Sequence, residues 1–144
     1  MKKKRYAIAH IRGDAEHPEL LGYVSFYDHP DGVLVTADIR GLPDSNTGFY
    51  GFHIHEGGEC TGEGFPDTGG HYTPGAERHP GHAGDLPPLL GVKGMAYMTV
   101  LTGRFELEDL TDRTVVIHSG PDDFKSQPAG DAGRKIACGV IRQA

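Results

Sequence analysis

The side chains with metal-binding chemistry gather in one stretch of the chain, from Gly51 to Leu86. This stretch holds five of the nine histidines, one of the two cysteines and Asp85. A sixth histidine of interest, His118, follows in the segment TVVIHSGPDD. Imidazole, thiolate and carboxylate groups are the protein ligands of zinc and copper. This set of residues predicts a two-metal site that carries out redox chemistry on a β scaffold.

The first pair, His53 and His55, has the spacing of two ligands on one strand. Their aromatic neighbours and Ile54 favour strand formation. Residues two apart in a strand point to the same face, with Cα atoms about 6.5–7 Å apart, so two imidazoles can converge on one metal ion. Taken alone, such a pair is more often two half-exposed strand histidines, and that alternative stays open at this point.

A second group follows with zinc-ligand character. His71, His79, His82 and Asp85 are spaced H-x7-H-x2-H-x2-D, and three imidazoles with one carboxylate suit tetrahedral zinc. The residues between them are rich in Gly and Pro and cannot bury much apolar surface, so something other than a core must order them. The alternative is a flexible, solvated His-rich loop that binds metal weakly and without purpose.

Four segments carry the strongest signal when they are taken together. They are GFHIHEGGEC (51–60), GGHYTP (69–74), HAGDLP (82–87) and VVIHSGPDDFKSQPAGDAGRKIACGVI (115–141). In this order and spacing they resemble the copper/zinc superoxide dismutase family of the bacterial type, from about Tyr6 to the C-terminus. The resemblance implies one domain over residues 1–144 and an enzyme that converts superoxide into dioxygen and hydrogen peroxide by copper redox cycling.

The resemblance also implies a role for each candidate ligand. The residues expected to hold copper are His53, His55, His71 and His118. Those expected to hold zinc are His71, His79, His82 and Asp85. His71 belongs to both sets, because an imidazole that loses both ring protons can bind one metal at each nitrogen. Its implied catalytic role is to leave copper on reduction and to take up a proton for the second half-cycle.

Three further positions take their roles from the resemblance. Asp122 matches the family aspartate that links a copper histidine to a zinc histidine, here His53 and His79. Cys60 and Cys138 match the family's disulfide pair, whereas two cysteines in a cytosolic protein would more often be free and buried. The bridge would close a loop of about 78 residues and contribute roughly 4–5 kcal/mol in the chain-entropy model.

The chain departs from the family pattern in two places. Relatives usually have arginine three residues before the last cysteine, where this chain has Lys135, with Arg134 one position earlier. We expect Lys135 to supply the catalytic positive charge, although lysine lacks the planar donor fork of arginine. The interval between His79 and His82 is also shorter than in many relatives. If the alignment places this deletion across His79 instead, the zinc site lacks one ligand. The alternatives are therefore a copper-only dismutase, or a non-enzymatic metal-binding or copper-delivery domain of the same fold.

Alternating apolar residues predict eight short strands and little helix. The clearest strand is 33–40, with Val33, Val35, Ala37 and Ile39 on one face. The others are expected at 6–11, 22–27, 49–55, 95–100, 105–107, 114–118 and 137–141. Eight short antiparallel strands favour an all-β, Greek-key flattened barrel, an immunoglobulin-like sandwich. Two long loops, 56–90 and 119–136, then carry the functional groups.

Composition limits the partners. The chain has 144 residues, which predicts one domain. Its net charge of −6 argues against nucleic acid as a partner.

No apolar run reaches membrane-spanning length. The basic start MKKKR precedes only six residues of apolar character before Arg12, too few for a signal peptide. The chain as written therefore predicts a cytoplasmic protein, although bacterial relatives are commonly exported. The family includes monomers and dimers, so a homodimer is compatible with it.

Overall fold

The computed structural model describes residues 6–144, so the basic run at positions 1–5 lies outside the described residues. The strands are β1 (Tyr6–Gly13), β2 (Leu21–His29), β3 (Gly32–Arg40), β4 (Phe49–Tyr50), β5 (Phe52–His55), β6 (Leu89–Leu90), β7 (Ala96–Thr102), β8 (Thr114–His118) and β9 (Lys135–Gln143). The helical segments are two short 3₁₀ helices, η1 (Pro66–Thr68) and η2 (Leu107–Asp109). None of the helices in the described part of the chain has the length and apolar character needed to cross a membrane.

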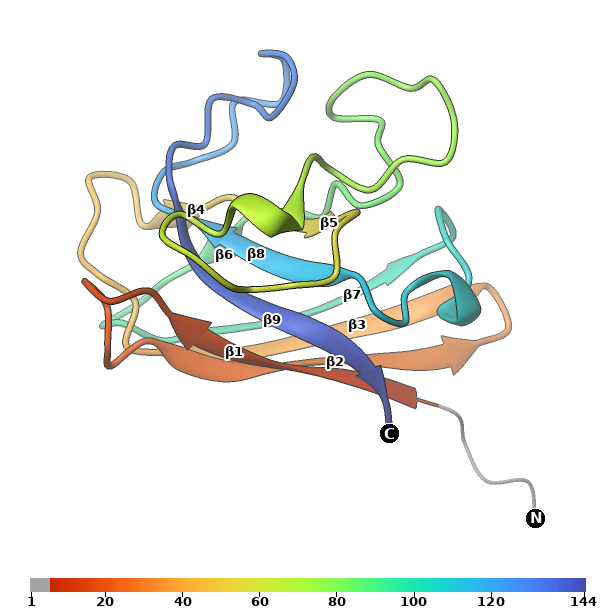
Figure 1. The fold of residues 1–144 in the computed structure, drawn as a ribbon, viewed down its shortest axis with the longest axis horizontal. Helices are drawn as coiled ribbons and strands as arrows, with labels where there is room; N and C mark the ends of the chain where they lie inside the picture. Colours follow the sequence, from red (N-terminus) through yellow and green to blue (C-terminus); the bar gives the residue numbers. More distant parts are fainter. Residues whose placement is uncertain (1–5) are drawn as a thin grey trace.

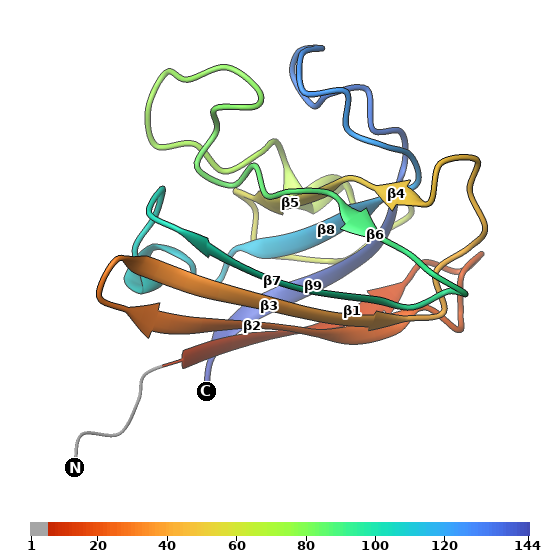
Figure 2. The same ribbon diagram turned by 180° about the vertical axis from the view of Figure 1, so that it is seen from behind.

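Seven of the strands form one antiparallel sheet that curls into a half-barrel (Figures 1 and 2). Its order is β5-β8-β9-β1-β2-β3-β7, so strands distant in sequence lie next to each other, as in a Greek key. The remaining strands, β4 and β6, pair with each other in a separate small sheet. The all-β, Greek-key prediction is therefore confirmed, with seven strands rather than eight in the main sheet.

The core fills the concave side of the curled sheet because apolar residues alternate along the strands. On β3, the predicted face of Val33, Val35, Ala37 and Ile39 is completely buried. Neighbouring strands add inward-facing side chains at matching register, such as Phe26 opposite Val35. Burial of this apolar surface is the main stabilisation of the sheet, and it supports the strands that carry three of the predicted ligands.

Two predicted strands differ in the structure. The expected strand 49–55 is interrupted at Gly51, where β4 leaves the main sheet and β5 joins β8. A side chain at Gly51 would come within 2.7 Å of Ala132. The predicted strand 105–107 is wrong: Glu106 and Asp109 form a capping box that starts η2, while Phe105 and Leu107 are buried without strand pairing.

The two long connections run over residues 56–88 and 119–134, and both rise on the same side of the half-barrel, above β5 and β8 (Figures 1 and 2). The predicted disulfide is confirmed: Cys60 in the first connection is bonded to Cys138 on β9, 78 positions away in sequence. Cys138 packs with Phe65 and Val116 in a small buried cluster of its own. The first connection is thus tied to the sheet close to its start.

Candidate metal centre

Strand β5 and its neighbour β8 bring three of the predicted ligands together. His53 and His55 lie on β5, and His118 ends β8, which pairs with β5 in antiparallel register. The 56–88 connection then returns to β5 twice, through isolated β-bridges that place His71 opposite His55 and Asp85 opposite His53. Backbone pairing therefore delivers ligands from a loop to the rigid strand.

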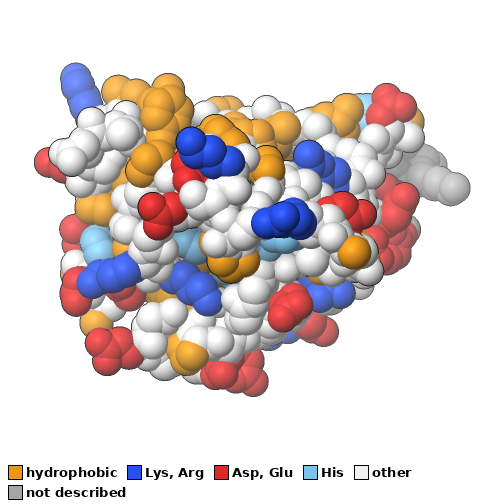
Figure 3. Space-filling model, turned by 90° about the horizontal axis from the view of Figure 1, so that it is seen from above, with side chains coloured by type: hydrophobic (Ala, Val, Ile, Leu, Met, Phe, Trp, Pro, Cys, Tyr) orange, Lys and Arg blue, Asp and Glu red, His pale blue; other side chains and the backbone are white. Residues whose placement is uncertain are grey.

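The first cluster consists of four buried histidines whose ligand atoms all lie within 4.8 Å of one another. Its members are His53, His55, His71 and His118. Figure 3 looks onto the face with the two long connections, where histidine surfaces show as small areas between other side chains. Neutral imidazole nitrogens in such a set are suitable ligands for copper.

Two members of this cluster face each other through unprotonated ring nitrogens. His55 Nδ1 donates to the Gly69 carbonyl at 2.8 Å, and His118 Nδ1 donates to the Gly133 carbonyl at 3.3 Å. Because a carbonyl can only accept, these bonds leave the Nε2 atoms of the neutral rings with lone pairs. The two Nε2 atoms lie 3.3 Å apart. Facing lone pairs at this distance repel each other, and a metal ion bound by both nitrogens would remove the repulsion.

The other two members have buried ring nitrogens without hydrogen bonds. His53 Nε2 donates to Asp122 at 2.9 Å, while His53 Nδ1 and His71 Nε2 have no partner among the described residues. Buried polar atoms are rarely left unsatisfied, so these nitrogens fit a metal ion. Burial lowers the pKa of His55 to about 2 and that of His118 to about 3, and it also lowers the pKa of His53. Neutral imidazole is the form that binds metals.

The second cluster is built around the Asp85 carboxylate. His71 Nδ1 lies 2.7 Å from Oδ1, and the Nδ1 atoms of His79 and His82 lie 3.0 and 3.1 Å from Oδ2. Burial acts to raise the pKa of Asp85, but the hydrogen bond with His71 and the charges of the surrounding histidines lower it overall. Three imidazole nitrogens converging on one ionised carboxylate match the ligand set of zinc.

Two histidines compete for the fourth place in this cluster. His53 also has a ligand atom within 4.8 Å of those of His71, His79 and Asp85. However, His82 Nδ1 is 3.1 Å from the carboxylate and 3.3 Å from His71 Nδ1, and its main-chain N–H donates to Asp85 at 3.0 Å. We therefore place His82 with the second cluster and His53 with the first.

The ring of His71 lies between the two clusters. Its Nδ1 faces Asp85, whereas its Nε2 is buried and has no hydrogen-bond partner among the described residues. The ring centroid is 4.0 Å from that of His53 and 4.9 Å from that of His55. One imidazole thus offers a nitrogen to each cluster, as required of a bridging ligand.

Asp122 joins the clusters a second time, from the 119–134 connection. Its Oδ2 accepts from His53 Nε2 at 2.9 Å, and its Oδ1 accepts from His79 Nε2 at 2.7 Å. Burial opposes ionisation, but these bonds and one from the Phe124 N–H outweigh it, so the pKa of Asp122 is lowered. The two donated protons fix both rings with their Nδ1 atoms available to a metal.

The two candidate cations lie in different environments. Lys135 is half-buried, and its ammonium group donates to Thr68 Oγ1 at 2.7 Å, to the Gly69 carbonyl at 3.2 Å and to the Phe65 carbonyl at 3.4 Å. Burial lowers the pKa of Lys135. Arg134 is exposed and forms an ion pair with Glu16 at 3.0 Å.

Sequence reasoning did not find several residues that support these clusters. They are Thr68, which holds Lys135, and Arg104 and Gln127, which bind backbone groups beside the second cluster. Each acts through contacts with a segment far away in sequence. No motif or periodicity encodes such contacts.

Comparison with known proteins agrees with this geometry. The family model described as copper/zinc superoxide dismutase (SODC) matches residues 20–141. A curated relative from Aquifex aeolicus, named superoxide dismutase [Cu-Zn] 2, is 38% identical over 139 residues, covering 86% of this chain and 80% of its own. The relative named superoxide dismutase [Cu-Zn] from Legionella pneumophila is 38% identical, and the match covers 87% of this chain and 80% of the relative. The relative of the same name from Caulobacter vibrioides is 33% identical, and the match covers 84% of this chain and 78% of the relative. The fold, the ligands and these matches define one class, and the chain belongs to the copper/zinc superoxide dismutase family.

Proposed function

We propose that this protein is a superoxide dismutase, which converts two superoxide anions and two protons into dioxygen and hydrogen peroxide. The observation that carries the proposal is the pair of adjoining ligand clusters that share His71. Bound copper supplies the one-electron redox chemistry, and zinc, which has no redox chemistry of its own, supplies fixed positive charge and order. We assign copper to the first cluster and zinc to the second.

The protein's own residues perform four tasks in this proposal. His71 holds a proton at Nε2 when that atom is not bound to metal, and it gives this proton to the reduced substrate. Asp122 keeps His53 and His79 in the tautomer that exposes Nδ1. Lys135 adds positive charge near the first cluster, which attracts an anionic substrate to a chain of net charge −6. The buried surroundings limit the access of water.

The alternatives predict different metal contents. A copper-only dismutase would not need three imidazoles converging on Asp85, and this arrangement favours the two-metal enzyme. A metal-binding or copper-delivery domain would bind copper without turnover. The interval between His79 and His82 is short, yet both Nδ1 atoms lie within 3.1 Å of the same carboxylate, which supports His79 as a zinc ligand.

The experiment is to load the protein with copper and zinc, determine both metals by elemental analysis, and assay superoxide consumption on the same sample. We expect about one copper and one zinc per chain, with rapid turnover, as for a two-metal site. His118→Gln should remove copper and activity, whereas His10→Gln, at an exposed position outside the clusters, should leave both unchanged. Full copper occupancy without turnover would refute the enzymatic function, and activity with copper alone would support the copper-only alternative.

A homodimer is the partner that the surface favours. Exposed apolar side chains lie on both sides of Asp38 and Arg40 of β3: Leu21 and Tyr23 on β2, and Leu90, Val92, Met95 and Tyr97 on β6, β7 and the segment between them. Tyr23 and Tyr97 flank Asp38 in the sheet register. Apolar patches rimmed by charge are typical of protein interfaces. Light scattering should therefore report twice the chain mass, and Tyr97→Lys should shift the mass toward that of the monomer. A monomer at all concentrations would contradict the dimer.

The cytoplasmic location expected from the sequence stays a prediction.

A further inference from the structure

The segment between two zinc-assigned ligands has little structure of its own. Only Pro80 and Gly81 separate His79 from His82, and one main-chain hydrogen bond, from Gly81 N–H to the Arg78 carbonyl at 2.6 Å, closes this turn. Such a segment cannot orient two imidazoles by itself, because each ordered residue costs about 1–2 kcal/mol of backbone entropy. Its geometry must come from neighbours.

The side-chain amide of Gln127 is the neighbour that contacts the His79 main chain. The His79 N–H donates to Gln127 Oε1 at 2.9 Å, and the His79 carbonyl accepts from Gln127 Nε2 at 2.6 Å. One amide therefore satisfies both backbone groups of a single residue, as a paired strand would do. Gln127 Nε2 also donates to the Lys125 carbonyl at 3.1 Å, which fixes the amide within its own connection.

The imidazole of His79 is held from the same connection. Asp122 accepts from Nε2 at 2.7 Å, so Nδ1 is left facing Asp85 at 3.0 Å. The side chain of His79 is fully buried. Backbone and ring are thus fixed together, and Nδ1 has no freedom to turn away from the carboxylate.

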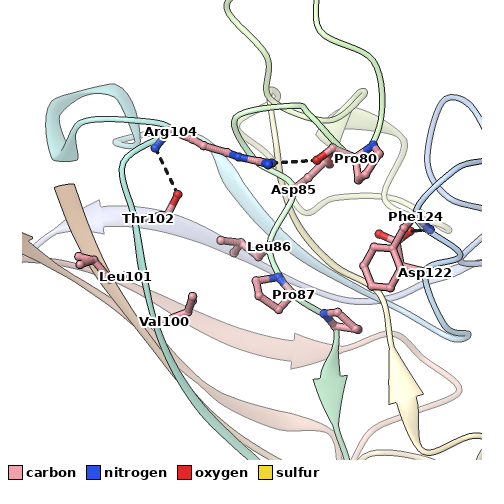
Figure 4. A pocket seen from close by; sticks show the side chains of 11 residues that line it. Pro80, Asp85, Leu86, Pro87, Val100, Leu101, Thr102, Arg104, Asp122 and Phe124 are labelled. Atoms are coloured by element: carbon pink, nitrogen blue, oxygen red, sulfur yellow. Dashed lines mark hydrogen bonds between the residues drawn. The ribbon is translucent and has the colours of Figure 1, made fainter. Parts of the chain in front are cut away.

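The other end of the segment is held from the opposite side. Arg104, in the connection after β7, donates from Nη1 to the Pro80 carbonyl at 2.8 Å and to the His82 carbonyl at 3.2 Å. Figure 4 shows Arg104 reaching the Pro80 carbonyl across the edge of a pocket of about 370 Å³ that is also lined by Asp85 and Asp122. Gln127 and Arg104 therefore hold different residues, and within residues 6–144 the hydrogen bonds to the His79 main chain come from Gln127.

We propose that Gln127 is a positioning residue for zinc: its amide holds the His79 main chain so that Nδ1 faces Asp85. This inference rests on the proposed assignment of His79 as a zinc ligand. It makes zinc affinity depend on residue 127, which contributes no ligand atom to either metal cluster and contacts only the main chain of His79. Loss of such indirect contacts typically weakens metal binding by about 10–100-fold.

The test measures zinc and copper dissociation constants by chelator competition, together with thermal unfolding of the metal-free protein. Gln127→Met keeps the length of the side chain but loses the two hydrogen bonds to His79 and the one to Lys125. We expect its zinc dissociation constant to rise about 10-fold or more. Copper affinity and the metal-free unfolding temperature should stay close to those of the unmodified protein. Gln127→Asn retains the amide but is one methylene shorter, so it should lose zinc affinity as well.

Matched variants separate this inference from the proposed function. Lys125→Gln changes an exposed side chain of the same connection and should leave zinc affinity unchanged. His79→Gln should weaken zinc binding at least as much as Gln127→Met. If His79→Gln weakens zinc binding but Gln127→Met does not, the proposed role of Gln127 is overturned and the assignment of His79 as a zinc ligand stands. Unchanged zinc affinity in His79→Gln would overturn the ligand assignment and this inference with it.

Discussion

His55 and His118 face each other through their Nε2 atoms at 3.3 Å, while the Nδ1 atom of each ring donates to a backbone carbonyl. Both rings are buried, so neither protonation nor water can easily relieve the contact. The folded chain therefore holds these two imidazoles in a geometry that suits a bound metal ion. In the metal-free protein this arrangement should lower the free energy of unfolding by a measurable amount.

The first prediction concerns the acid sensitivity of the metal-free protein. Burial lowers the pKa of His55 to about 2 and of His118 to about 3, and it lowers that of His53, from an ordinary value of 6.5. Below pH 6.5 the unfolded chain therefore binds more protons than the folded chain. The free energy of unfolding should fall by up to about 1.4 kcal/mol per pH unit for each such histidine.

Urea unfolding of the metal-free protein at pH 7.5, 6.5 and 5.5 would measure this dependence, and these conditions bracket the ordinary histidine pKa. Below about pH 4, protonation of Asp85 and Asp122, whose pKa values are lowered in the fold, should add to the loss. His10→Gln, at an exposed site, should leave the slope unchanged. A free energy of unfolding that does not change from pH 7.5 to 5.5 would rule out neutral buried histidines.

The second prediction concerns Asp122, which accepts one hydrogen bond from His53 and one from His79. Asp122→Asn retains only one oxygen acceptor, so one of the two histidine donors is left without a partner. We expect zinc affinity to fall by about 10–100-fold, measured by dialysis against a chelator and elemental analysis. Asp123→Asn is the matched control, because that exposed carboxylate bonds only within its own turn. Equal zinc retention in both variants would argue against the link.

The third prediction separates two roles of Lys135. Its three ammonium donors are all used on Thr68, Gly69 and Phe65, so we expect it to attract superoxide by charge rather than by direct hydrogen bonding. Lys135→Met should lower kcat/KM about 10-fold at low ionic strength and weaken its salt dependence. Lys135→Arg should keep the salt dependence.

Lys93→Met provides the control for Lys135, because it makes the same change of charge in the exposed turn before β7. Stopped-flow measurement of superoxide decay at several salt concentrations would compare the three variants. If Lys135→Met and Lys93→Met behaved alike, the charge of Lys135 would have no special position relative to the site.

The fourth prediction concerns the ion pair between Glu16 and Arg134, which are both exposed and 3.0 Å apart. With Lys135, they line a pocket of about 360 Å³. Glu16→Gln removes the carboxylate paired with Arg134 and leaves it only the weaker interactions with Asp14 and Glu63, so the local potential becomes more positive. The superoxide association rate at low ionic strength should rise by roughly twofold. Glu19→Gln, at another exposed position, should have a smaller effect, and a slower rate for Glu16→Gln would contradict the prediction.

The fold class could be predicted from the sequence because alternation along a strand is a local property. The buried face of β3 follows directly from the pattern of Val33 to Ile39. The prediction failed where a local pattern was overruled by its surroundings. Residues 105–107 have apolar side chains at strand spacing, but a capping box begins η2 there. The predicted strand 49–55 is divided at Gly51, where a side chain would come within 2.7 Å of Ala132, a contact with a residue 81 positions away.

The candidate ligands were recognisable for a similar reason: histidines and carboxylates can be identified from residue type and spacing alone. Their division into two clusters was implied by family resemblance, and their contacts depend on the folded chain. Backbone pairing brings His71 and Asp85 to β5, and Gln127 reaches His79 across 48 positions. Such contacts depend on how the two long connections pack on each other. No residue near His79 in sequence specifies its partner, because side-chain hydrogen bonds over long separations leave no periodic pattern.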